Sequence, residues 1–596
     1  MTDFQSEYKK WCQSSVFDEQ TRREVSALTD EGEIQDRFYR SLSFGTGGLR
    51  GLIGAGTNRM NIYTVGKATQ GLANYIHQQT KTSGQTPSAV IAYDSRNMSY
   101  EFALCAALVL CANGIKTYLF EGLRPTPELS FAVRHLRCTA GIMVTASHNP
   151  PAYNGYKVYW QDGGQIVAPH DREIIAAVNA VNGFESVKRM EESEAIEQGL
   201  LRFIGKQVDD QYIFAVKKTL LNAPLLKTAA QELKIVYTPL HGTGNIPVRR
   251  VLKELGFTKV WVVPEQELPD GNFSTVEYPN PEDGKAFALA LKLARKKDAD
   301  VVLATDPDAD RLGIYAKDAQ TGEYLAFTGN MSGLLIADYR LSQLQERGEL
   351  PQTPADGALV TTVVSSNMAF EVAKAYGLSV IEVLTGFKFI GEQIKLFEDA
   401  KNANSGKLNK DKYAYEYLFG FEESYGCLVG THARDKDAIA AVASLCEAAA
   451  YYKSKGLTLC DKMREMYEKY GHYLERQESI TLQGVAGVEK IREIMEDFKT
   501  NPPQTLADAA VLALRDYQTG VRKDCGTGVQ TLLTLPKSDV FYLELEGDGW
   551  CCIRPSGTEP KIKFYWGVKG QTAEDAEQKA EALQHALLRR VYGEEA

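Results

Sequence analysis

Short apolar runs alternate with helical segments along the first two thirds of the chain. The pattern predicts a strand at 89–93 and a helix from Ser99, its expected N-cap, to Ala112, where Asn113-Gly114 ends it. Further strands are predicted at 115–120 and 141–144. This alternation is typical of a mainly parallel sheet covered by helices.

The same rhythm restarts twice, which predicts three related α/β units. The second has strands at 234–237, 260–263 and 300–304 and a helix at 248–255; the third has strands at 358–364 and 379–383 around a helix ending at Tyr376-Gly377. Each unit places a polar loop directly after an apolar strand, where open parallel sheets bind ligands. These loops are 145–150, 306–311 and 385–388.

The last part of the chain has a different pattern. Segments 542–546, 550–553 and 561–566 predict antiparallel strands around the turn Gly547-Asp548-Gly549, before a helix from Thr572. We therefore predict the α/β class, with three related α/β domains of mixed, mainly parallel sheets and a C-terminal α+β domain. The Lys- and Asn-rich segment 402–412 is expected to be an exposed loop.

Size and charge narrow the class of protein. A chain of 596 residues exceeds what one hydrophobic core usually supports. The formal net charge of -10 provides no basic footprint for nucleic acid or an anionic membrane. The polar N-terminus has no signal pattern, and the apolar stretch 102–112 is too short for a membrane span, so we expect a cytoplasmic protein with reduced cysteines.

The loop 306–311 concentrates acidic residues. Asp306, Asp308 and Asp310 alternate directly after an apolar strand, and three hard oxygen ligands suit an octahedral divalent cation. An EF-hand is excluded because Arg311 replaces the turn glycine and Lys317 replaces the bidentate acid. A simple turn is the alternative, but three acids so close repel one another unless a cation lies among them.

Three other loops contain groups suited to phosphate chemistry. Ser147-His148 in 145–150 offers a hydroxyl beside an imidazole, although such a dipeptide taken alone is more typical of a capped turn. The glycine-rich 45–51, with Arg50, could cradle phosphate but matches no nucleotide-binding fingerprint. The segment 554–561 gathers a guanidinium, two hydroxyls and an ammonium around one turn, which favours a phosphate dianion over a plain turn.

Taken in this order, the segments resemble the α-D-phosphohexomutase superfamily, specifically its phosphoglucomutase-like branch. The resemblance covers nearly the whole chain and rests on the serine loop 145–150, the metal loop 306–311, the sugar loop 420–424 and the phosphate loop 554–558. It implies four domains around a central cleft. The expected boundaries are 1–205 with the phosphoserine loop, 206–325 with the metal loop, 326–465 with the sugar loop and 466–596 with the phosphate loop.

The resemblance also implies roles for individual residues. Ser147 would be the phosphorylated serine and would bind Mg²⁺ together with Asp306, Asp308 and Asp310. Lys157 matches a lysine used for proton transfer, with His148 as the alternative, and Arg50, Arg311 and Lys436 would line the same site. Thr385, Gly386 and Lys388 fall in the loop that reads sugar orientation. Glu422 and Ser424 would bind sugar hydroxyls, and Arg554, Ser556, Gly557 and Thr558 the phosphate that is not reacting.

One position departs from part of the family. Many bacterial phosphomannomutases and phosphoglucosamine mutases have a His two residues after the sugar-loop Ser, where this chain has Gly426. The departure weakens a mannose or glucosamine interpretation. The segments 237–242 and 385–390 resemble the branch that also contains phosphopentomutases and glucose-bisphosphate synthases.

The expected activity is interconversion of glucose 1-phosphate and glucose 6-phosphate, with Mg²⁺ as cofactor and glucose 1,6-bisphosphate as intermediate and activator. Pentose or mannose phosphates, or bisphosphate synthesis, stay open as alternatives. A metal-dependent sugar phosphatase would need water at the phosphoserine, and a sugar-phosphate sensor would need neither Ser147 nor the aspartates. The expected partners are small sugar phosphates, and a monomer and a dimer are both compatible with the sequence.

Overall fold

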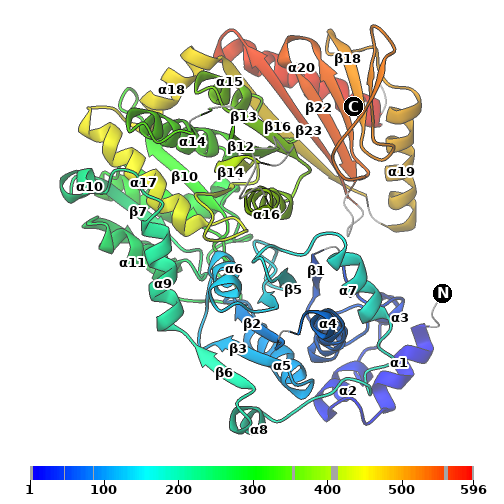
Figure 1. Cartoon of the computed structure of the whole chain (residues 1–596). Coiled ribbons are helices and arrows are strands. Elements are labelled where there is room, and N and C mark those ends of the chain that lie inside the picture. The colour runs from blue at the N-terminus through cyan, green and yellow to red at the C-terminus, as the bar shows by residue number, and fades with distance from the viewer. Residues whose placement is uncertain are drawn as a thin grey trace. The chain divides into compact units, whose positions relative to one another are not determined.

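The computed structural model describes residues 4–45, 47–84, 86–351, 353, 356–403, 414–482, 484–555 and 561–592. The chain forms two compact units (Figure 1). The first comprises 1–329, 387–414 and 424–458, and the second 330–386, 415–423 and 459–596. Both the serine loop and the metal loop therefore belong to the first unit.

A six-stranded sheet dominates the N-terminal part of the first unit. Its order is β1-β5-β4-β2-β3-β6, with β4, β2, β3 and β6 parallel and β5 and β1 antiparallel to their neighbours. The strands are β1 (Gly48–Leu52), β2 (Ser88–Tyr93), β3 (Lys116–Phe120), β4 (Ala140–Val144), β5 (Tyr153–Trp160) and β6 (Leu201–Ile204). The helices are α1 (Phe4–Gln13), α2 (Glu19–Ser26), α3 (Glu31–Phe38), α4 (Ile62–Ser83), α5 (Ser99–Ala112), α6 (Thr126–His135), α7 (His170–Asn179) and α8 (Glu192–Glu197).

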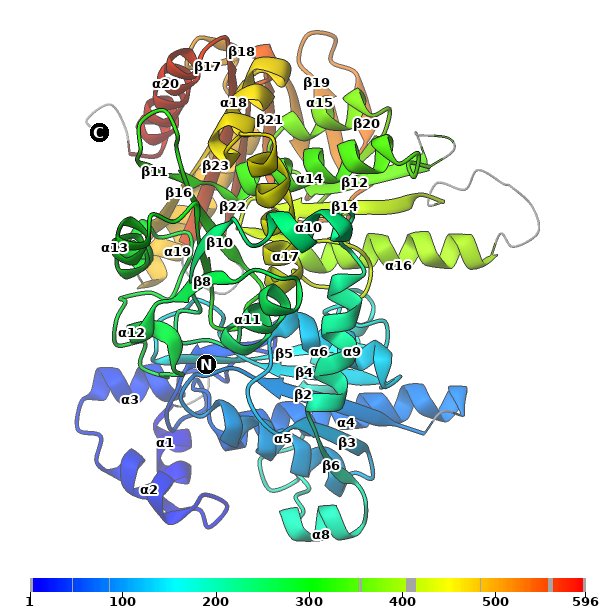
Figure 2. The ribbon, with the colours of Figure 1, turned by 90° about the vertical axis from the view of Figure 1, so that its left-hand side faces the viewer.

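Helices cover both faces of this sheet, and the alternation of side chains along β2 shows why the strand is apolar throughout. Ala89 and Ile91 pack on one face with α4 and α5, whereas Val90 and Ala92 pack on the other face with α6. Figure 2 shows α5 and α6 on opposite sides of β2. The leader helices α1 to α3 form a separate aromatic cluster around Trp11.

A five-stranded sheet carries the metal loop. Its order is β11-β10-β9-β7-β8, with β9, β7 and β8 parallel. The strands are β7 (Lys234–Thr238), β8 (Lys259–Val262), β9 (Val301–Thr305), β10 (Leu312–Lys317) and β11 (Tyr324–Phe327). The helical elements are α9 (Lys206–Lys217), α10 (Ala223–Ala229), α11 (Asn245–Glu254), α12 (Pro264–Glu267), η1 (Gly284–Phe287) and α13 (Ala288–Lys297), and α16 (Phe387–Ala403), β15 (Gly426–Leu428) and α17 (Ala438–Ser454) complete the unit.

The second unit begins with parallel strands in the order β13-β12-β14. These elements are α14 (Gly329–Glu346), β12 (Gly357–Thr362), α15 (Met368–Ala375), β13 (Ser379–Val383), β14 (Glu416–Glu422) and α18 (Leu459–Tyr470). Strand β12 lies between β13 and β14. It is buried at all six positions, as expected for a central strand of a parallel sheet.

An antiparallel sheet forms the C-terminal part of the second unit. Its order is β16-β23-β22-β21-β18-β19-β20, and β17 pairs with β18. The strands are β16 (His472–Thr481), β17 (Thr505–Leu506), β18 (Ala509–Asp516), β19 (Val521–Asp524), β20 (Gln530–Leu532), β21 (Phe541–Leu545), β22 (Trp550–Pro555) and β23 (Lys561–Gly570), with α19 (Gly484–Thr500), η3 (Glu546–Asp548) and α20 (Ala573–Tyr592). This confirms the predicted α+β domain.

The structure corrects two local predictions. Ser99 is the first residue of α5 and not its N-cap; the cap position is Met98, and the Ser99 hydroxyl donates instead to Asp94. Residues 402 and 403 end α16, and the rest of the predicted loop 402–412 lies outside the described residues.

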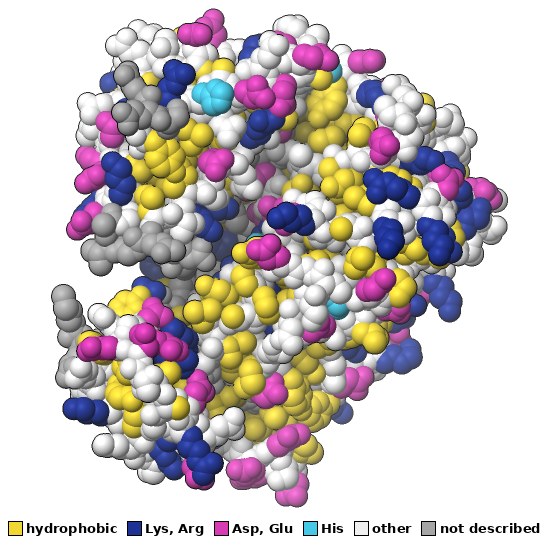
Figure 3. Space-filling model, turned by 180° about the vertical axis from the view of Figure 1, so that it is seen from behind, with side chains coloured by type: hydrophobic (Ala, Val, Ile, Leu, Met, Phe, Trp, Pro, Cys, Tyr) yellow, Lys and Arg dark blue, Asp and Glu magenta, His cyan; other side chains and the backbone are white. Residues whose placement is uncertain are grey.

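On the face shown in Figure 3, Lys and Arg side chains are interspersed with Asp and Glu. Among the described helices, none combines the length and apolar character needed to cross a bilayer. None of the ten cysteines, all of which lie in the described residues, forms a disulfide, and the adjacent Cys551 and Cys552 are both buried on β22.

Candidate active site

Ser147 stands just beyond the end of β4, in the first unit. Its φ of 51° lies in the left-handed region, which residues with a side chain rarely adopt. The hydroxyl Oγ donates to Asp306 Oδ2 at 2.7 Å, and it is 3.2 Å from His148 Nδ1. The serine loop and the metal loop therefore meet at the Ser147 hydroxyl, as expected for a phosphoserine beside a cation.

The three aspartates converge after β9. Each offers a carboxylate oxygen within 4.8 Å of the others, and all three side chains are buried. Asp306 Oδ1 accepts the backbone N–H groups of Asp310 and Arg311 at 3.1 and 3.0 Å. Thr126 holds Asp308 twice, through its hydroxyl at 2.8 Å and through its N–H, which donates to the Asp308 carbonyl at 2.9 Å.

The acids repel one another in the absence of a cation. Burial and the neighbouring carboxylates of Asp308 and Asp310 raise the pKa of Asp306 well above its ordinary value. Burial and Asp308 likewise raise the pKa of Asp310. For Asp308 burial acts in the same direction, but Lys157 and hydrogen bonds outweigh it and lower the pKa.

The aspartates suit a divalent cation. Oδ1 of Asp308 and Oδ1 of Asp310 are buried and accept no hydrogen bond from any described residue. Buried carboxylate oxygens without donors are the hard ligands that Mg²⁺ and similar ions prefer. A cation held there would also remove the mutual repulsion of the acids.

Two lysines face the acids from other elements. Lys157, on β5, donates to Asp308 Oδ2 at 2.8 Å, and Lys436, which follows β15, lies 3.1 Å from Asp310 Oδ2. A lysine that transfers protons near neutral pH would need a lowered pKa, but the pKa of Lys157 is raised. Burial does lower it, but Asp308, Asp310 and Asp435 outweigh burial, so the net pKa is raised.

The remaining predicted residues of the first unit surround this centre. Burial and the cations Arg311 and Arg50 lower the pKa of His148 well below its ordinary value, so the imidazole is neutral. Arg50, on β1, donates to Asn149 Oδ1 at 3.3 Å. Arg311 pairs with Glu282 and lies 3.8 Å from Asp310.

The sugar-binding and phosphate-binding predictions are divided between the units. Lys388 on α16 and Ser424 belong to the first unit, where Leu312 N–H donates to the Tyr425 carbonyl at 2.9 Å. Burial lowers the pKa of Lys388. The second unit contains Thr385, Gly386, Glu422 and Arg554, whereas Ser556, Gly557 and Thr558 lie outside the described residues.

Sequence reasoning missed several residues that hold the site. Asp94 and Arg96 follow β2 and bind the serine loop, Thr126 binds Asp308, and Glu282 pairs with Arg311. Asp94 and Arg96 carried a usable signal, because they form a polar loop directly after an apolar strand. Thr126 and Glu282 are isolated polar residues with no such pattern.

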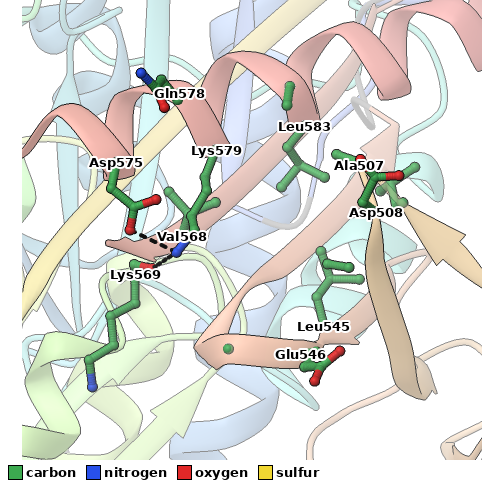
Figure 4. Close-up of a pocket in the computed structure, with 14 residues that line it drawn as sticks. Ala507, Asp508, Leu545, Glu546, Val568, Lys569, Asp575, Gln578, Lys579 and Leu583 are labelled. Carbon is green, nitrogen blue, oxygen red and sulfur yellow. Dashed lines mark hydrogen bonds and ion pairs between the residues drawn. The ribbon is translucent and has the colours of Figure 1, made fainter. Parts of the chain in front are cut away.

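A separate cavity of about 420 Å³ lies in the second unit between α20 and the ends of β17, β21 and β23 (Figure 4). Leu545, Val568 and Leu583 provide apolar walls, and Lys579 donates to Asp575 at 2.9 Å beside them. None of the predicted site residues lines this cavity.

Models of four phosphoglucomutase/phosphomannomutase domains match the chain: alpha/beta/alpha domains I, II and III at residues 41–183, 210–321 and 328–470, and the C-terminal domain at 542–585. A phosphoglucomutase of Staphylococcus aureus strain MRSA252 is 38% identical over 554 residues, covering 92% of this chain and 94% of the relative. The chain belongs to the phosphoglucomutase/phosphomannomutase family.

Solved structures of this family share the fold. The Paramecium protein pp63/parafusin, a phosphoglucomutase, aligns with a TM-score of 0.66 at 17% identity, covering 94% of this chain and 96% of its own. A phosphoglucomutase/phosphomannomutase family protein of Burkholderia thailandensis aligns with a TM-score of 0.61 at 17% identity, covering 92% and 98%. The predicted superfamily and fold class are confirmed by the domain matches and the curated relative.

Proposed function

We propose that this chain is a phosphoglucomutase that interconverts α-D-glucose 1-phosphate and glucose 6-phosphate through phospho-Ser147. The observation that carries the proposal is the 2.7 Å contact between the Ser147 hydroxyl and Asp306, within a buried triad of aspartates. The S. aureus phosphoglucomutase, similar over nearly its whole length, supports glucose as the sugar.

Asp306, Asp308, Asp310 and the phosphate on Ser147 would hold Mg²⁺. When bound, the ion would neutralise charge on the phosphoryl group during transfer. The chain's own residues orient the reacting groups. Thr126 and Lys157 fix Asp308, and the backbone amides of the loop fix Asp306.

In the first half of the reaction, a free hydroxyl of the sugar monophosphate attacks phosphorus, and the bond from phosphorus to Ser147 Oγ breaks. The sugar hydroxyl loses its proton, the released Ser147 Oγ takes one up, and bound glucose 1,6-bisphosphate results. In the second half the bisphosphate, turned end to end, returns its other phosphoryl group to Ser147. No water is consumed, which distinguishes the mutase from a phosphatase.

The electrostatics favour different roles for the two proton-transfer candidates. His148 is neutral and has a nitrogen 3.2 Å from Ser147 Oγ, so it can accept a proton. Lys157 is held in its charged form by three carboxylates, so it is suited to neutralising phosphate charge and to donating a proton. The proposed partners are sugar phosphates, and Arg50, Arg311 and Lys436 supply further positive charge beside Ser147.

The test is Ser147→Ala. We expect loss of mutase activity with an unchanged melting temperature, because this loop hydroxyl contributes little packing. Intact-mass spectrometry should find a phosphate adduct on the wild type that the variant lacks. Full activity in the variant would disprove the proposal.

A substrate panel separates the related activities. Rates with glucose 1-phosphate, mannose 1-phosphate and ribose 1-phosphate, each with catalytic bisphosphate present, should be highest with glucose. A higher rate with ribose 1-phosphate would indicate a phosphopentomutase. Phosphate release from glucose 1-phosphate as fast as isomerisation would indicate a phosphatase.

A further inference from the structure

The backbone at Ser147 is held in a conformation that it would not adopt unaided. A left-handed φ of 51° at a serine needs support from the surrounding structure. The loop after β2, residues 94–97, provides that support through hydrogen bonds to the serine loop. Both the Asp94 and the Arg96 side chains are fully buried.

Arg96 binds the serine loop through main-chain carbonyls. Its Nη2 donates to the carbonyls of Ser147 and Asn149, and its Nη1 donates to those of Pro150 and Tyr153 at 2.9 and 3.1 Å. These carbonyls run from the nucleophile itself to the first residue of β5. A planar guanidinium fork can hold four acceptors at once, whereas an ammonium group cannot reproduce that geometry.

Asp94 controls the other backbone group of Ser147 indirectly. It accepts hydrogen bonds from the hydroxyls of Thr145 at 2.6 Å and Ser99 at 2.7 Å. Thr145 Oγ1 in turn accepts the Ser147 N–H at 2.8 Å. Since the Thr145 hydroxyl gives its proton to Asp94, its lone pairs face the Ser147 amide. The loop after β2 therefore holds both backbone groups of Ser147: Arg96 binds its C=O directly, and Asp94 holds its N–H through Thr145.

The same loop also contacts the part of the unit that carries the metal loop. The Arg96 guanidinium lies over the Phe273 ring at 4.9 Å, and Asn97 donates to Asn272 at 2.9 Å. Gly271 allows this approach, because a Cβ there would lie 2.7 Å from the Asn97 backbone nitrogen. Arg96 thus contacts the serine loop and Phe273 at the same time.

We propose that Arg96, with Asp94 and Thr145, is a positioning residue that places the Ser147 hydroxyl against the metal-loop carboxylates. The inference rests on the proposed function of Ser147. Arg96 acts through the backbone and does not touch the reacting groups, because the hydrogen bonds of its guanidinium go to main-chain carbonyl oxygens of residues 147–153. A displaced nucleophile transfers slowly even when substrate binds normally.

The test compares two buried arginines that both bind main-chain carbonyls. Arg96→Lys is compared with Arg59→Lys, because Arg59 binds Asp36 and Asn58 at a site without any predicted catalytic residue. The measurements are the melting temperature, the KM for glucose 1-phosphate and the single-turnover rate of transfer from phospho-Ser147. We expect Arg96→Lys to slow transfer about 100-fold while KM changes less than about threefold. Arg59→Lys should lower the melting temperature similarly but leave the transfer rate near that of the wild type.

A wild-type transfer rate in Arg96→Lys, or equal slowing in Arg59→Lys, would overturn the positioning role. If Arg96→Lys fails to fold, Thr145→Val decides, since it removes only the link from Asp94 to the Ser147 N–H. Thr145→Val should slow transfer about 10-fold at an unchanged KM, and an unaffected rate would overturn the proposal. Ser147→Ala separates the two hypotheses: an active Ser147→Ala disproves the proposed function, whereas an inactive one beside a normal Arg96→Lys disproves only the positioning role.

Discussion

Two side-chain donors, the Thr126 hydroxyl and the Lys157 ammonium, share one oxygen of the Asp308 carboxylate. The other oxygen is buried without a donor among the described residues, and it is the atom that we propose as a cation ligand. Asp308→Asn keeps the shape and removes one negative charge. Mg²⁺ affinity should fall about 10-fold or more, and turnover at limiting Mg²⁺ should fall with it.

A magnesium titration of activity measures this effect. Asp318→Asn is the matched control, because Asp318 is equally buried but binds its own turn through Thr321 and Gln320. That control should leave the titration midpoint unchanged. An unchanged midpoint in Asp308→Asn would mean that the aspartates form only a turn.

The path of the Lys436 side chain explains why this chain has Gly426 where some family members have a histidine. A Cβ on Gly426 would lie 1.9 Å from Cδ of Lys436, so the lysine stem passes directly over the glycine. That path brings the Lys436 ammonium to 3.1 Å from Asp310. Gly426→Ala should therefore displace Lys436 from Asp310 and reduce kcat about 10-fold or more.

The control for this variant is Gly456→Ala. Gly456 ends a helix at the surface and a Cβ there meets no atom within 4 Å, although its φ of 78° gives the variant a backbone penalty of its own. It should lower the melting temperature without changing kcat. If Gly426→Ala keeps wild-type kcat, the position of Lys436 does not matter for catalysis.

At the scale of elements, the strands predicted in the three α/β units were placed to within about two residues, because burial on both faces makes such strands continuously apolar. Strand β2 was expected at 89–93 and is observed at 88–93. The start of α5 was predicted wrongly, since Ser99 would cap a helix by local rules but its hydroxyl binds Asp94. A cap assignment fails where a tertiary partner takes the capping group, and sequence alone does not reveal that partner.

Strand β16 carries a half-buried acid, Glu475, that links stability to pH. Glu475 accepts a hydrogen bond from Asn330 at 3.0 Å, but its Oε1 is shielded from solvent without a donor among the described residues. Burial raises its pKa from 4.5 to about 7. The folded state therefore holds a proton that the unfolded state releases, so stability from this group is full below pH 4.5 and is lost as pH rises through 7.

Glu475→Gln should remove this dependence. The variant should gain stability relative to wild type between pH 5 and pH 8, by about 1–3 kcal/mol, because glutamine is never charged. Chemical denaturation at the two pH values measures the difference. Glu478→Gln on the same strand removes the same charge and is the control. If the difference in unfolding free energy between Glu475→Gln and wild type is the same at pH 5 and pH 8, the predicted titration of Glu475 is wrong.

At the scale of the whole molecule, the sequence predicted which loops carry the chemistry but not how they are held. Ser147 and the aspartates were predictable because their loops resemble family motifs. The Thr126 contact to Asp308 joins residues 182 positions apart, and the Arg96 contact to Ser147 joins residues 51 apart. Neither pairing follows from local spacing or periodicity. The raised pKa of Lys157 was also not predictable, since it depends on the sum of several distant carboxylates.

The phosphate loop gives a prediction that concerns the complete reaction cycle. Arg554 lies at the end of β22 in the second unit, whereas Ser147 lies in the first. If Arg554 binds the phosphate that is not reacting, Arg554→Lys keeps the charge but loses the bidentate fork, which should cost about 1.5–3 kcal/mol of binding. KM for glucose 1-phosphate should rise about 10-fold or more, and kcat should also fall, because remote binding energy helps to orient the reacting hydroxyl.

Escape of the intermediate is the more specific consequence of the same substitution. The bisphosphate must turn over without leaving, so weaker binding at Arg554 should release more of it and increase the dependence on added glucose 1,6-bisphosphate. Steady-state assays across a bisphosphate titration measure this dependence. Arg522→Lys is the control, because Arg522 forms a bidentate pair with Glu544 and has no predicted phosphate contact. A wild-type KM and an unchanged bisphosphate requirement in Arg554→Lys would show that this arginine does not hold the second phosphate.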